Sequence, residues 1–337
     1  MEASLYEKLG ENIVRCHLCH HHCRIKEGQR GLCQVRQNRH GVLETLVYGR
    51  LIARHVDPIE KKPLFHVLLG TRSYSIATVG CNFRCAFCQN ADIAQLPADH
   101  DGMIVGTPAT PEEVVADALA RECRTVAYTY TEPTVFFEFV RDTARLAAAE
   151  GLRNVLVTNG YMTLEALQAI GSDLHAANVD LKSFSDDFYR TYCGARLEGV
   201  TETLVNMRRL GIFVEVTTLV IPGLNDDPDE LRALAEFIVS SLGDQTPWHV
   251  SRFHPTYRLL DRPATPLATL TRARAIGLQA GLKHVYVGNT PGLDGENTVC
   301  PGCGQVLIRR RGFSLGPIRL QNGACPDCGA PVAGIWQ

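Results

Sequence analysis

The cysteines of this chain are the feature that most restricts what it can fold into. There are 13 of them in 337 residues, and they are grouped tightly, unlike the dispersed cysteines of a secreted disulfide framework. Three groups contain all but two of them: Cys16, Cys19, Cys23 and Cys33; Cys81, Cys85 and Cys88; and Cys300, Cys303, Cys325 and Cys328. Cys123 and Cys193 stand alone and are expected in the core. Tight groups in a reducing compartment are typical of metal sites.

Composition and charge indicate a folded protein without a strongly charged surface. Hydrophobic residues make up 45% and charged residues 21% of the chain, and 34 Lys and Arg against 36 Asp and Glu give a net charge of −2. These values exclude wholesale disorder and give no reason to expect nucleic acid or an anionic membrane as a partner. Because the chain begins without a signal-peptide pattern and has no apolar run of about 18 residues, we expect a cytoplasmic protein without a membrane span.

Short β-rich runs alternate with amphipathic stretches between the second and third cysteine groups. The runs are 73–79, 125–130, 154–159, 177–181, 213–220, 248–253 and 284–287, and the helical patterns include 111–123, 134–151, 227–242 and 266–281. Thr110 predicts a helix start, and Gly151 and Gly281 predict helix ends. The alternation predicts an α/β fold, either a complete or partial (β/α) barrel or a doubly wound open sheet. Gly-rich phosphate-binding fingerprints are missing, which disfavours a nucleotide-binding doubly wound sheet.

The second cysteine group lies directly after the first of these predicted strands, in the segment GCNFRCAFCQN. Its C-x3-C-x2-C spacing places three thiolates on one short loop, where they can hold three irons of a [4Fe-4S] cluster and leave the fourth iron without a protein ligand. An iron with an open position can bind and reduce a substrate. The alternatives are a structural zinc site that lacks one ligand and three unrelated core cysteines, but zinc sites favour paired knuckles and four ligands.

This loop, together with further blocks in order along nearly the whole chain, resembles the radical SAM superfamily, and within it the pyruvate formate-lyase activating enzyme branch. The blocks are CHLCHHHCRIKEGQRGLC, YTYTEPTVFFEF, VTNGY, DLKSF, TTLVIPGLND, SRFHPTY, VYVGN and the pair CPGCG and CPDCG. Together they are most similar to the AmmeMemoRadiSam system radical SAM enzymes. The resemblance implies a partial (β/α)6-type barrel over residues 67–292, a Cys-rich metal-binding segment over 1–66 and a zinc-ribbon-like tail over 293–337.

The resemblance also implies a reaction. A [4Fe-4S] cluster on Cys81, Cys85 and Cys88 would bind S-adenosylmethionine (SAM) and cleave it reductively to methionine and a 5′-deoxyadenosyl radical, which abstracts hydrogen from a substrate. That substrate would be a small molecule, or a protein glycine as in the activating enzymes. The implied partners are a flavodoxin or ferredoxin as reductant and the partner proteins of the AmmeMemoRadiSam system. The alternative, an iron-sulfur electron-transfer or sensor protein that does not cleave SAM, predicts a fourth protein ligand to the cluster.

Residues at the predicted carboxyl ends of the strands fall where the superfamily binds SAM or substrate. The implied SAM-binding residues are Phe87, Thr131, Glu132, Asn159, Asp180, Lys182, Thr217 and Asn289, and the residue expected near substrate is His254. Thr129, Thr131 and Glu132 stand where the superfamily usually has Gly-Gly-Glu. The carboxylate that can accept from an ammonium group is kept there, but the two glycines are absent.

Several of these residues also have a plainer interpretation. Phe87 fits an ordinary core aromatic residue, and His254 fits a rim residue. Asp180 and Lys182 fit a structural ion pair, because buried charges need partners.

The two terminal cysteine groups each offer four thiolates. The C-terminal group forms two C-P-x-C-G knuckles, the signature of a zinc ribbon, although the same geometry holds a single iron in rubredoxins. Zinc is preferred there, with the role of stapling a tail too short to fold alone. For the uneven C-x2-C-x3-C-x9-C spacing of the N-terminal group, four-sulfur zinc is the first interpretation and an auxiliary iron-sulfur cluster the second. The run Arg309–Arg311 is a weak nucleic-acid signal, since such runs are usually a solvated face.

Overall fold

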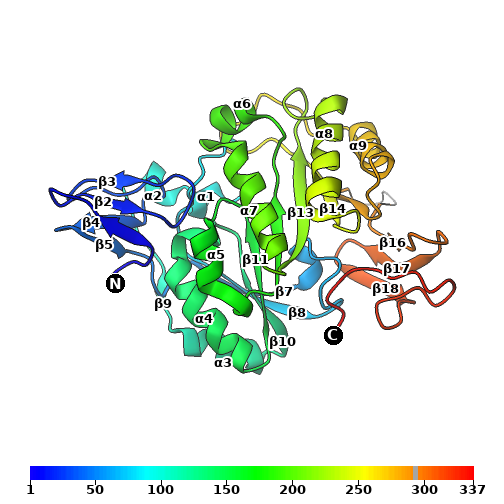
Figure 1. Ribbon diagram of the computed structural model, residues 1–337, viewed down its shortest axis with the longest axis horizontal. Helices are drawn as coiled ribbons and strands as arrows, with labels where there is room; N and C mark the ends of the chain where they lie inside the picture. The colour runs from blue at the N-terminus through cyan, green and yellow to red at the C-terminus, as the bar shows by residue number, and fades with distance from the viewer. Residues whose placement is uncertain (291–294) are drawn as a thin grey trace.

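The molecule has a central α/β body with a small β-rich unit on either side (Figure 1). The structure is a computed structural model that describes residues 1–290 and 295–337. In Figure 1 the N-terminal unit, in blue, and the C-terminal unit, in orange and red, lie at opposite ends of the body. The first and third cysteine groups therefore belong to units at opposite ends of the body.

Within the described residues, the body is built on an eight-stranded sheet of order β15-β14-β13-β12-β11-β10-β8-β7. Its parallel strands are β8 (Arg72–Ala77), β10 (Cys123–Tyr128), β11 (Arg153–Thr158), β12 (Ala176–Asp180), β13 (Phe213–Val220), β14 (Trp248–Arg252) and β15 (Val285–Gly288). Their spatial order follows the chain without reversal, whereas a doubly wound sheet reverses at a switch point. The expected partial barrel is thus confirmed over the doubly wound sheet. The antiparallel edge strand β7 (Ala53–Pro58), which pairs with β8, was not predicted.

Helices fill the connections between the parallel strands. They are α1 (Ala91–Ala94), α2 (Leu96–Asp99), α3 (Pro111–Ala120), α4 (Phe137–Ala149), α5 (Leu164–Ile170), α6 (Asp186–Phe188), α7 (Leu197–Arg209), α8 (Pro228–Phe237) and α9 (Leu267–Gln279). A capping box starts α3, because Thr110 Oγ1 accepts from Glu113 N at 3.2 Å while Glu113 Oε2 accepts from Thr110 N at 3.0 Å. Gly151 and Gly281, at φ of 78° and 110°, follow α4 and α9 as predicted. Helix α3 stops three residues early because Cys123 already belongs to β10.

The N-terminal unit consists of short antiparallel strands fastened to α4. Its strands are β1 (Tyr6–Lys8), β2 (Val14–Cys16), β3 (Arg24–Ile25), β4 (Arg36–Arg39) and β5 (Val42–Thr45), and β6 (Arg50–Leu51) pairs with β9 (Thr107–Pro108). The buried guanidinium of Arg36 forms an ion pair with the buried carboxylate of Glu138 in α4, and Glu138 also accepts from Ser4 N at 2.7 Å. Since β7 comes from the same segment, residues 1–66 contribute to both this unit and the main sheet. The domain limits expected from the sequence stay a prediction.

The C-terminal unit contains a three-stranded sheet of β16 (Thr298–Val299), β17 (Val306–Arg311) and β18 (Ser314–Ile318). Arg310, in the basic run, is only 7% exposed. Its guanidinium lies over the Phe65 ring at 4.4 Å and donates to Phe65 O at 2.6 Å, which ties the tail to the segment before β8. The sequence interpretation of this run as a solvated face is therefore wrong for its central residue. Among the described residues, no helix combines the length and the apolar character that a membrane crossing requires.

Helix α9 packs closely against β14 at Gly277. A Cβ atom built at position 277 would lie 2.7 Å from Cε3 of Trp248, whose side chain is fully buried. The indole cannot easily move away, because its Nε1 donates to Thr218 Oγ1 at 2.9 Å. Glycine is thus needed at position 277 for packing.

We expect Gly277→Ala to lower the free energy of unfolding by about 1–3 kcal/mol through overpacking, although alanine is the better helix former. The measurement is urea or thermal unfolding followed by circular dichroism. Gln279→Ala, at an exposed position of the same helix, should stay within about 0.5 kcal/mol of the parent chain. A stabilising effect of Gly277→Ala would contradict the close approach.

Candidate active site

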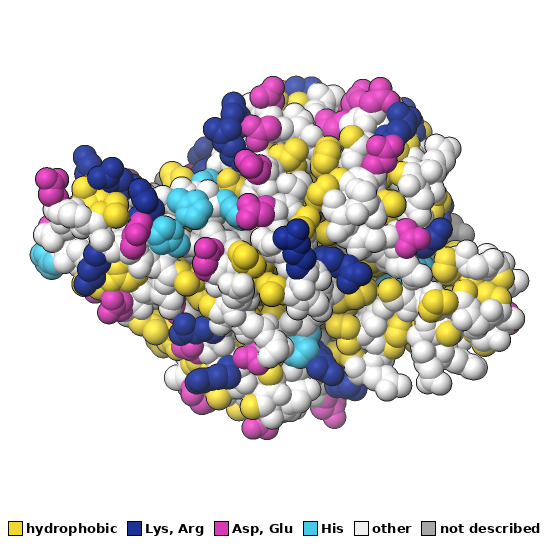
Figure 2. Space-filling view, in the orientation of Figure 1, with side chains coloured by type: hydrophobic (Ala, Val, Ile, Leu, Met, Phe, Trp, Pro, Cys, Tyr) yellow, Lys and Arg dark blue, Asp and Glu magenta, His cyan; other side chains and the backbone are white. Residues whose placement is uncertain are grey.

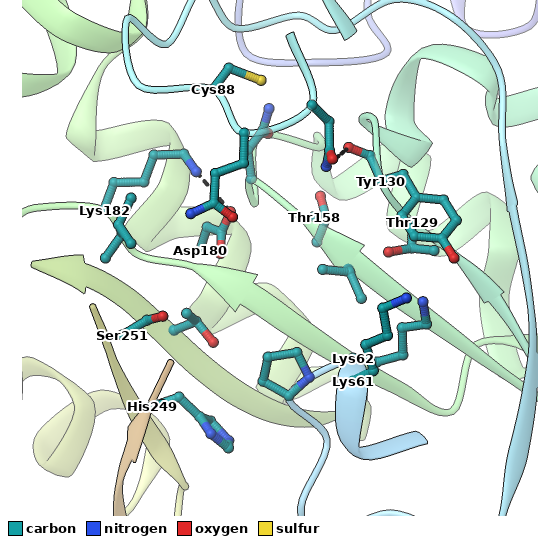
Figure 3. Close-up of a pocket in the computed structure, with 18 of the residues that line it drawn as sticks. Lys61, Lys62, Cys88, Thr129, Tyr130, Thr158, Asp180, Lys182, His249 and Ser251 are labelled. Carbon is teal, nitrogen blue, oxygen red and sulfur yellow. Dashed lines mark hydrogen bonds and ion pairs between the residues drawn. The ribbon is translucent and has the colours of Figure 1, made fainter. Parts of the chain in front are cut away.

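A cavity of about 590 Å³ lies at the carboxyl ends of the parallel strands (Figure 3), where a barrel places its site. The strand register brings its lining together, since Asp180 pairs with Thr217 and Thr217 pairs with His249 across three neighbouring strands. Glu296, Gly312 and Phe313 of the C-terminal unit complete one part of the wall. Segments far apart in the sequence thus form one enclosure.

The loop after β8 brings Cys81, Cys85 and Cys88 to this cavity. The π-helical turn η4 (Tyr189–Cys193) holds the loop, since Arg84 N donates to Cys193 O at 2.7 Å and Ala86 N donates to Tyr192 O at 2.9 Å. The Cys81 Sγ atom accepts from Phe83 N at 3.4 Å. Backbone hydrogen bonds therefore fix the loop that carries the three thiols.

The chemistry and spacing of these three thiols fit an iron-sulfur cluster. Burial raises the pKa of Cys81, and the Glu132 carboxylate and the neighbouring cysteines add to the effect. Burial, followed by the charge of Cys85, raises the pKa of Cys88 to about 11. Bound cations would offset this accumulation of negative charge. Tetrahedral zinc places its sulfurs roughly 3.8 Å apart, but among the described residues the only group with all ligand atoms within 4.8 Å is the C-terminal one. The spread of the central thiols suits a cluster better than a single ion.

Glu132 organises the junction between β10 and β11. Its Oε1 atom accepts from Thr134 N at 3.0 Å and from Thr158 Oγ1 at 2.7 Å, and its Oε2 atom accepts from Asn159 N at 2.8 Å. Burial raises the pKa of Glu132, while these hydrogen bonds act in the opposite direction. Asn159 in turn donates through Nδ2 to Asn82 Oδ1 at 2.7 Å, beside Cys81. One network thus connects Glu132 to the cysteine loop.

Asp180, Lys182 and Phe87 form a second group on the cavity wall. Figure 3 shows the Lys182 side chain extending toward Asp180, where Nζ donates to Oδ2 at 2.7 Å. Burial disfavours the charged form of Lys182, but Asp180 and the nearby thiols outweigh it and raise the pKa of Lys182. The Lys182 Nζ atom lies 6.0 Å from the centre of the Phe87 ring. Asp180 and Lys182 therefore form an ion pair, which is the structural role that the sequence also allowed for them. Both residues also line the cavity.

The structure brings most of the remaining candidates into the cavity as well. Thr131 Oγ1 donates to Thr78 O at 2.8 Å, Thr217 Oγ1 donates to Asn178 Oδ1 at 2.9 Å, and Asn289 Nδ2 donates to Ser251 Oγ at 2.9 Å. The side chains of Thr131, Thr217 and Asn289 all line the cavity. Their binding roles stay predictions, since each polar group already has a partner within the protein.

His254 is the exception among the candidates. It is exposed and does not line the cavity, whereas His249, five residues earlier in β14, does. The His249 Nε2 atom lies 2.7 Å from Oε2 of the buried Glu215, which also accepts from the backbone N–H groups of Phe65 and His66. Of these two histidines, His249 is therefore the one that lies on the cavity wall.

Sequence reasoning missed a basic group on the segment before the cysteine loop. Lys61 and Lys62 line the cavity, and the Lys62 Nζ atom lies 2.6 Å from Asp57 Oδ2 and 4.4 Å from the centre of the Tyr130 ring. Burial lowers the pKa of Lys62 to about 8 despite the Asp57 carboxylate. The only sequence signal for this group is a pair of adjacent lysines four and five residues after an aspartate.

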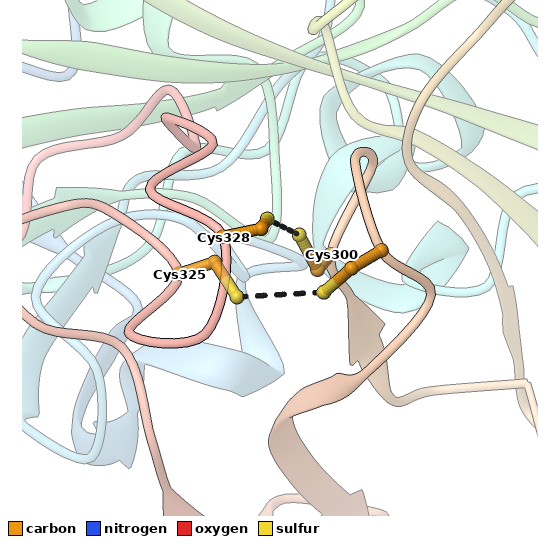
Figure 4. Close-up of side chains that lie close together, drawn as sticks. Cys300, Cys325 and Cys328 are labelled. Atoms are coloured by element: carbon orange, nitrogen blue, oxygen red, sulfur yellow. Dashed lines mark hydrogen bonds between the residues drawn. The ribbon is translucent and has the colours of Figure 1, made fainter.

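The C-terminal cysteines form a separate metal centre (Figure 4). The Cys300 and Cys328 sulfurs are 3.5 Å apart, and the Cys303 and Cys325 sulfurs are 3.7 Å apart. These separations agree with the roughly 3.8 Å expected around one tetrahedral zinc, and all four sulfurs lie within 4.8 Å of one another. The group can hold a metal ion, and zinc and iron both fit this donor set.

Known proteins share these features. The family model "Radical SAM superfamily" matches residues 75–238. The chain is 48% identical to the uncharacterized protein MJ0808 of Methanocaldococcus jannaschii. That alignment extends over 333 residues and covers 98% of each chain. It is 28% identical to the pyruvate formate-lyase 1-activating enzyme of Escherichia coli K12. That alignment extends over 165 residues and covers 47% of this chain and 65% of the enzyme.

Solved structures share the fold. A radical SAM methyltransferase from Sphaerobacter thermophilus is similar with a TM-score of 0.50 and 15% identity, covering 70% of each chain. SuiB of Streptococcus suis, bound to S-adenosylmethionine, is similar with a TM-score of 0.51 and 13% identity, covering 68% of this chain and 53% of that one. The family match and the curated relatives together show that the chain contains a radical SAM domain and is homologous to the pyruvate formate-lyase activating enzymes.

Proposed function

We propose that the protein is a radical SAM enzyme that acts on a small-molecule or protein substrate. A [4Fe-4S] cluster held by Cys81, Cys85 and Cys88 would supply the electron that cleaves SAM to methionine and a hydrogen-abstracting 5′-deoxyadenosyl radical. The observation that carries the proposal is the placement of three spread thiols on a 590 Å³ cavity at the carboxyl rim of the barrel. The similarity to the pyruvate formate-lyase 1-activating enzyme, whose name gives another protein as its target, supports a protein as one substrate class.

The residues around the cysteines are suited to hold the two charged ends of a methionine group. The Lys182 ammonium donates one hydrogen bond to Asp180 and keeps further donors for a carboxylate. The Glu132 Oε2 atom accepts from Asn159 N and, as a carboxylate oxygen, has capacity for an ammonium donor as well. Phe87 offers an apolar face next to Lys182 for a planar ring.

The other side of the cavity supports a polar substrate. Figure 3 shows Lys61, Lys62 and His249 across the cavity from Cys88 and Lys182. The Lys62 ammonium, with its pKa lowered to about 8 by burial, can give up a proton near neutral pH, and His249 is held by Glu215. These groups can orient an anionic or hydrogen-bonding substrate against the SAM site.

A second candidate function, electron transfer or sensing without SAM cleavage, is favoured by the position of Cys193. The turn η4 brings Cys193 to the loop, since Arg84 N donates to Cys193 O at 2.7 Å, and the buried Cys193 is the largest cause that raises the pKa of Cys85. The fold thus brings a fourth cysteine beside the loop, which the sequence interpretation did not foresee. If Cys193 completed the cluster, SAM would leave the electron paramagnetic resonance (EPR) spectrum of the reduced cluster unchanged in the parent chain and alter it in Cys193→Ala.

The setting of the reaction follows from its chemistry. We place the protein in the cytoplasm, where thiols stay reduced, with a flavodoxin or ferredoxin as electron donor and the partner proteins of the AmmeMemoRadiSam system as candidate partners. At the C-terminal site we propose zinc, in a structural role that holds the tail against the barrel.

The first test of SAM cleavage uses anaerobically reconstituted protein reduced with dithionite and mixed with SAM, with 5′-deoxyadenosine measured by mass spectrometry. The parent chain and Cys123→Ala, which removes a cysteine remote from the cavity lining, should both form it. Cys85→Ala should fall to the background level, because one iron loses its ligand. If the parent chain forms none, even with candidate partners added and the cluster fully reduced, the electron-transfer function replaces this one.

The role of Glu132 predicts a loss of SAM affinity. Glu132→Gln removes a charged acceptor and turns an amide donor toward the Asn159 N–H group, which should weaken SAM binding by about 1.5–3 kcal/mol, or roughly 10–150-fold. The readout is the SAM concentration that half-converts the EPR spectrum of the reduced cluster. Glu296→Gln, on the part of the wall formed by the tail, serves as the matched control and should leave this concentration unchanged. Equal affinity in the two variants would assign Glu132 a purely structural role.

A further inference from the structure

The four N-terminal cysteines line a small, separate cavity of about 20 Å³. Cys16 ends β2, and Cys19, Cys23 and Cys33 come from the turns that follow β2 and β3. Apolar side chains complete much of the lining, among them Leu18, Ile25, Leu32 and Val135. The cavity is too small for an organic ligand and leaves room only for a compact inorganic group.

The spacing of the N-terminal sulfurs differs from that of the C-terminal ones. The C-terminal sulfurs all lie within 4.8 Å of one another, as one tetrahedral ion requires. Within residues 1–290 and 295–337, no other set of three or more Cys, His, Asp or Glu ligand atoms is that compact. The N-terminal group and the central triplet therefore share the same property: several thiols surround a common space but stand too far apart for a single ion. A cluster of several irons accommodates such spacing, because each thiolate binds a different iron.

The surroundings of these sulfurs also suit a cluster. Arg36 Nη1 donates to Cys16 Sγ at 3.5 Å, so a buried cation lies against one thiol. Burial is the largest cause that raises the pKa values of Cys19 and Cys33, and backbone N–H groups next to them act in the opposite direction by stabilising the thiolates. Hydrogen bonds and positive charge at the sulfurs are among the factors that set the reduction potential of an iron-sulfur cluster.

The nearby histidines do not provide an alternative zinc site. Histidines gather on the surface where the N-terminal unit meets the body (Figure 2). The His17 Nε2 atom lies 3.3 Å from Glu7 Oε1, and His20 Nε2 lies 3.2 Å from Thr203 Oγ1. Within the described parts of the chain, none of them joins a compact set of ligand atoms.

The N-terminal cavity also lies next to the central cysteine loop. Its lining includes His21 and Asn82, and the His21 Nε2 atom lies 2.8 Å from Asn82 O. Asn82 directly follows Cys81, whose sulfur lies 3.9 Å from Asn82 Oδ1. Only one residue separates His21 from Cys19 in the chain. A short path of covalent bonds and one hydrogen bond therefore connects the two groups of thiols.

We propose that Cys16, Cys19, Cys23 and Cys33 bind an auxiliary iron-sulfur cluster, and not the zinc ion preferred on sequence spacing alone. The second part of the proposal concerns electron transfer and rests on the proposed function. A low-potential donor protein is oxidised by one electron and reduces the auxiliary cluster. The same electron then passes along the path through His21 and Asn82 to the central site.

The occupancy test compares full-length variants reconstituted anaerobically with iron and sulfide. The first replaces the central triplet (Cys81→Ala, Cys85→Ala and Cys88→Ala), the second carries Cys19→Ala and Cys33→Ala, and Cys123→Ala is the control. Iron, zinc and acid-labile sulfide are counted, and EPR spectra are recorded after reduction with and without SAM. These readouts do not depend on turnover, so the result for the N-terminal site stands even if SAM is not cleaved.

The proposal expects the central-triplet variant to keep iron and labile sulfide, with an EPR signal that SAM does not change. The Cys19 and Cys33 variant should lose that signal and keep the central one, which also shows that it is folded. Zinc should accompany the C-terminal site alone. Absence of iron and sulfide from the central-triplet variant, or a second zinc in it, would overturn the proposal.

Electron transfer from the auxiliary cluster to the central site has its own readout. In the Cys19 and Cys33 variant, dithionite should still reduce the central cluster, whereas rapid reduction by a flavodoxin or ferredoxin should be lost. Reduction by the donor protein at the rate of the Cys123→Ala control would overturn the proposed electron transfer through the auxiliary cluster. The proposal that this cluster is present would be unaffected.

Discussion

Holding three thiols apart on one irregular loop is the constraint on which the rest of this structure depends. The loop after β8 has little regular structure of its own, so its shape comes from outside it. The turn η4 accepts two of its backbone N–H groups, and Gln95 Nε2 donates to Phe83 O at 3.0 Å from the helices that follow. Sheet, turn and helices together fix positions that the loop could not keep alone.

Strand positions could be predicted because the strands are buried on both sides and therefore read as short β-branched runs. From them followed the carboxyl rim, and with it most residues that line the cavity. His254 was expected in the site but does not line the cavity, because β14 ends at Arg252 and the chain leaves the rim there. Within β14, His249 and Ser251 are two residues apart and so face the same side, which is the periodicity that identifies the inward histidine.

Other features depend on contacts between distant segments, which spacing along the chain does not encode. The separation of the N-terminal sulfurs is one, since C-x2-C-x3-C-x9-C is compatible with a single ion and with a cluster. The proximity of Cys193 to Cys85, 108 positions apart, is another. Lys62 is a third, because its burial depends on β7 joining the sheet through a segment with no strong strand pattern.

The tail has a role in the cavity that goes beyond stability. The tip between β17 and β18 contributes Gly312 and Phe313 to the cavity wall, and Glu296 of the same unit accepts from Gly312 N at 2.7 Å. The size and shape of the cavity are therefore set partly by a hairpin outside the barrel. Related chains could diverge in specificity by changing the length of that hairpin, while the barrel and its cysteine loop stay as they are.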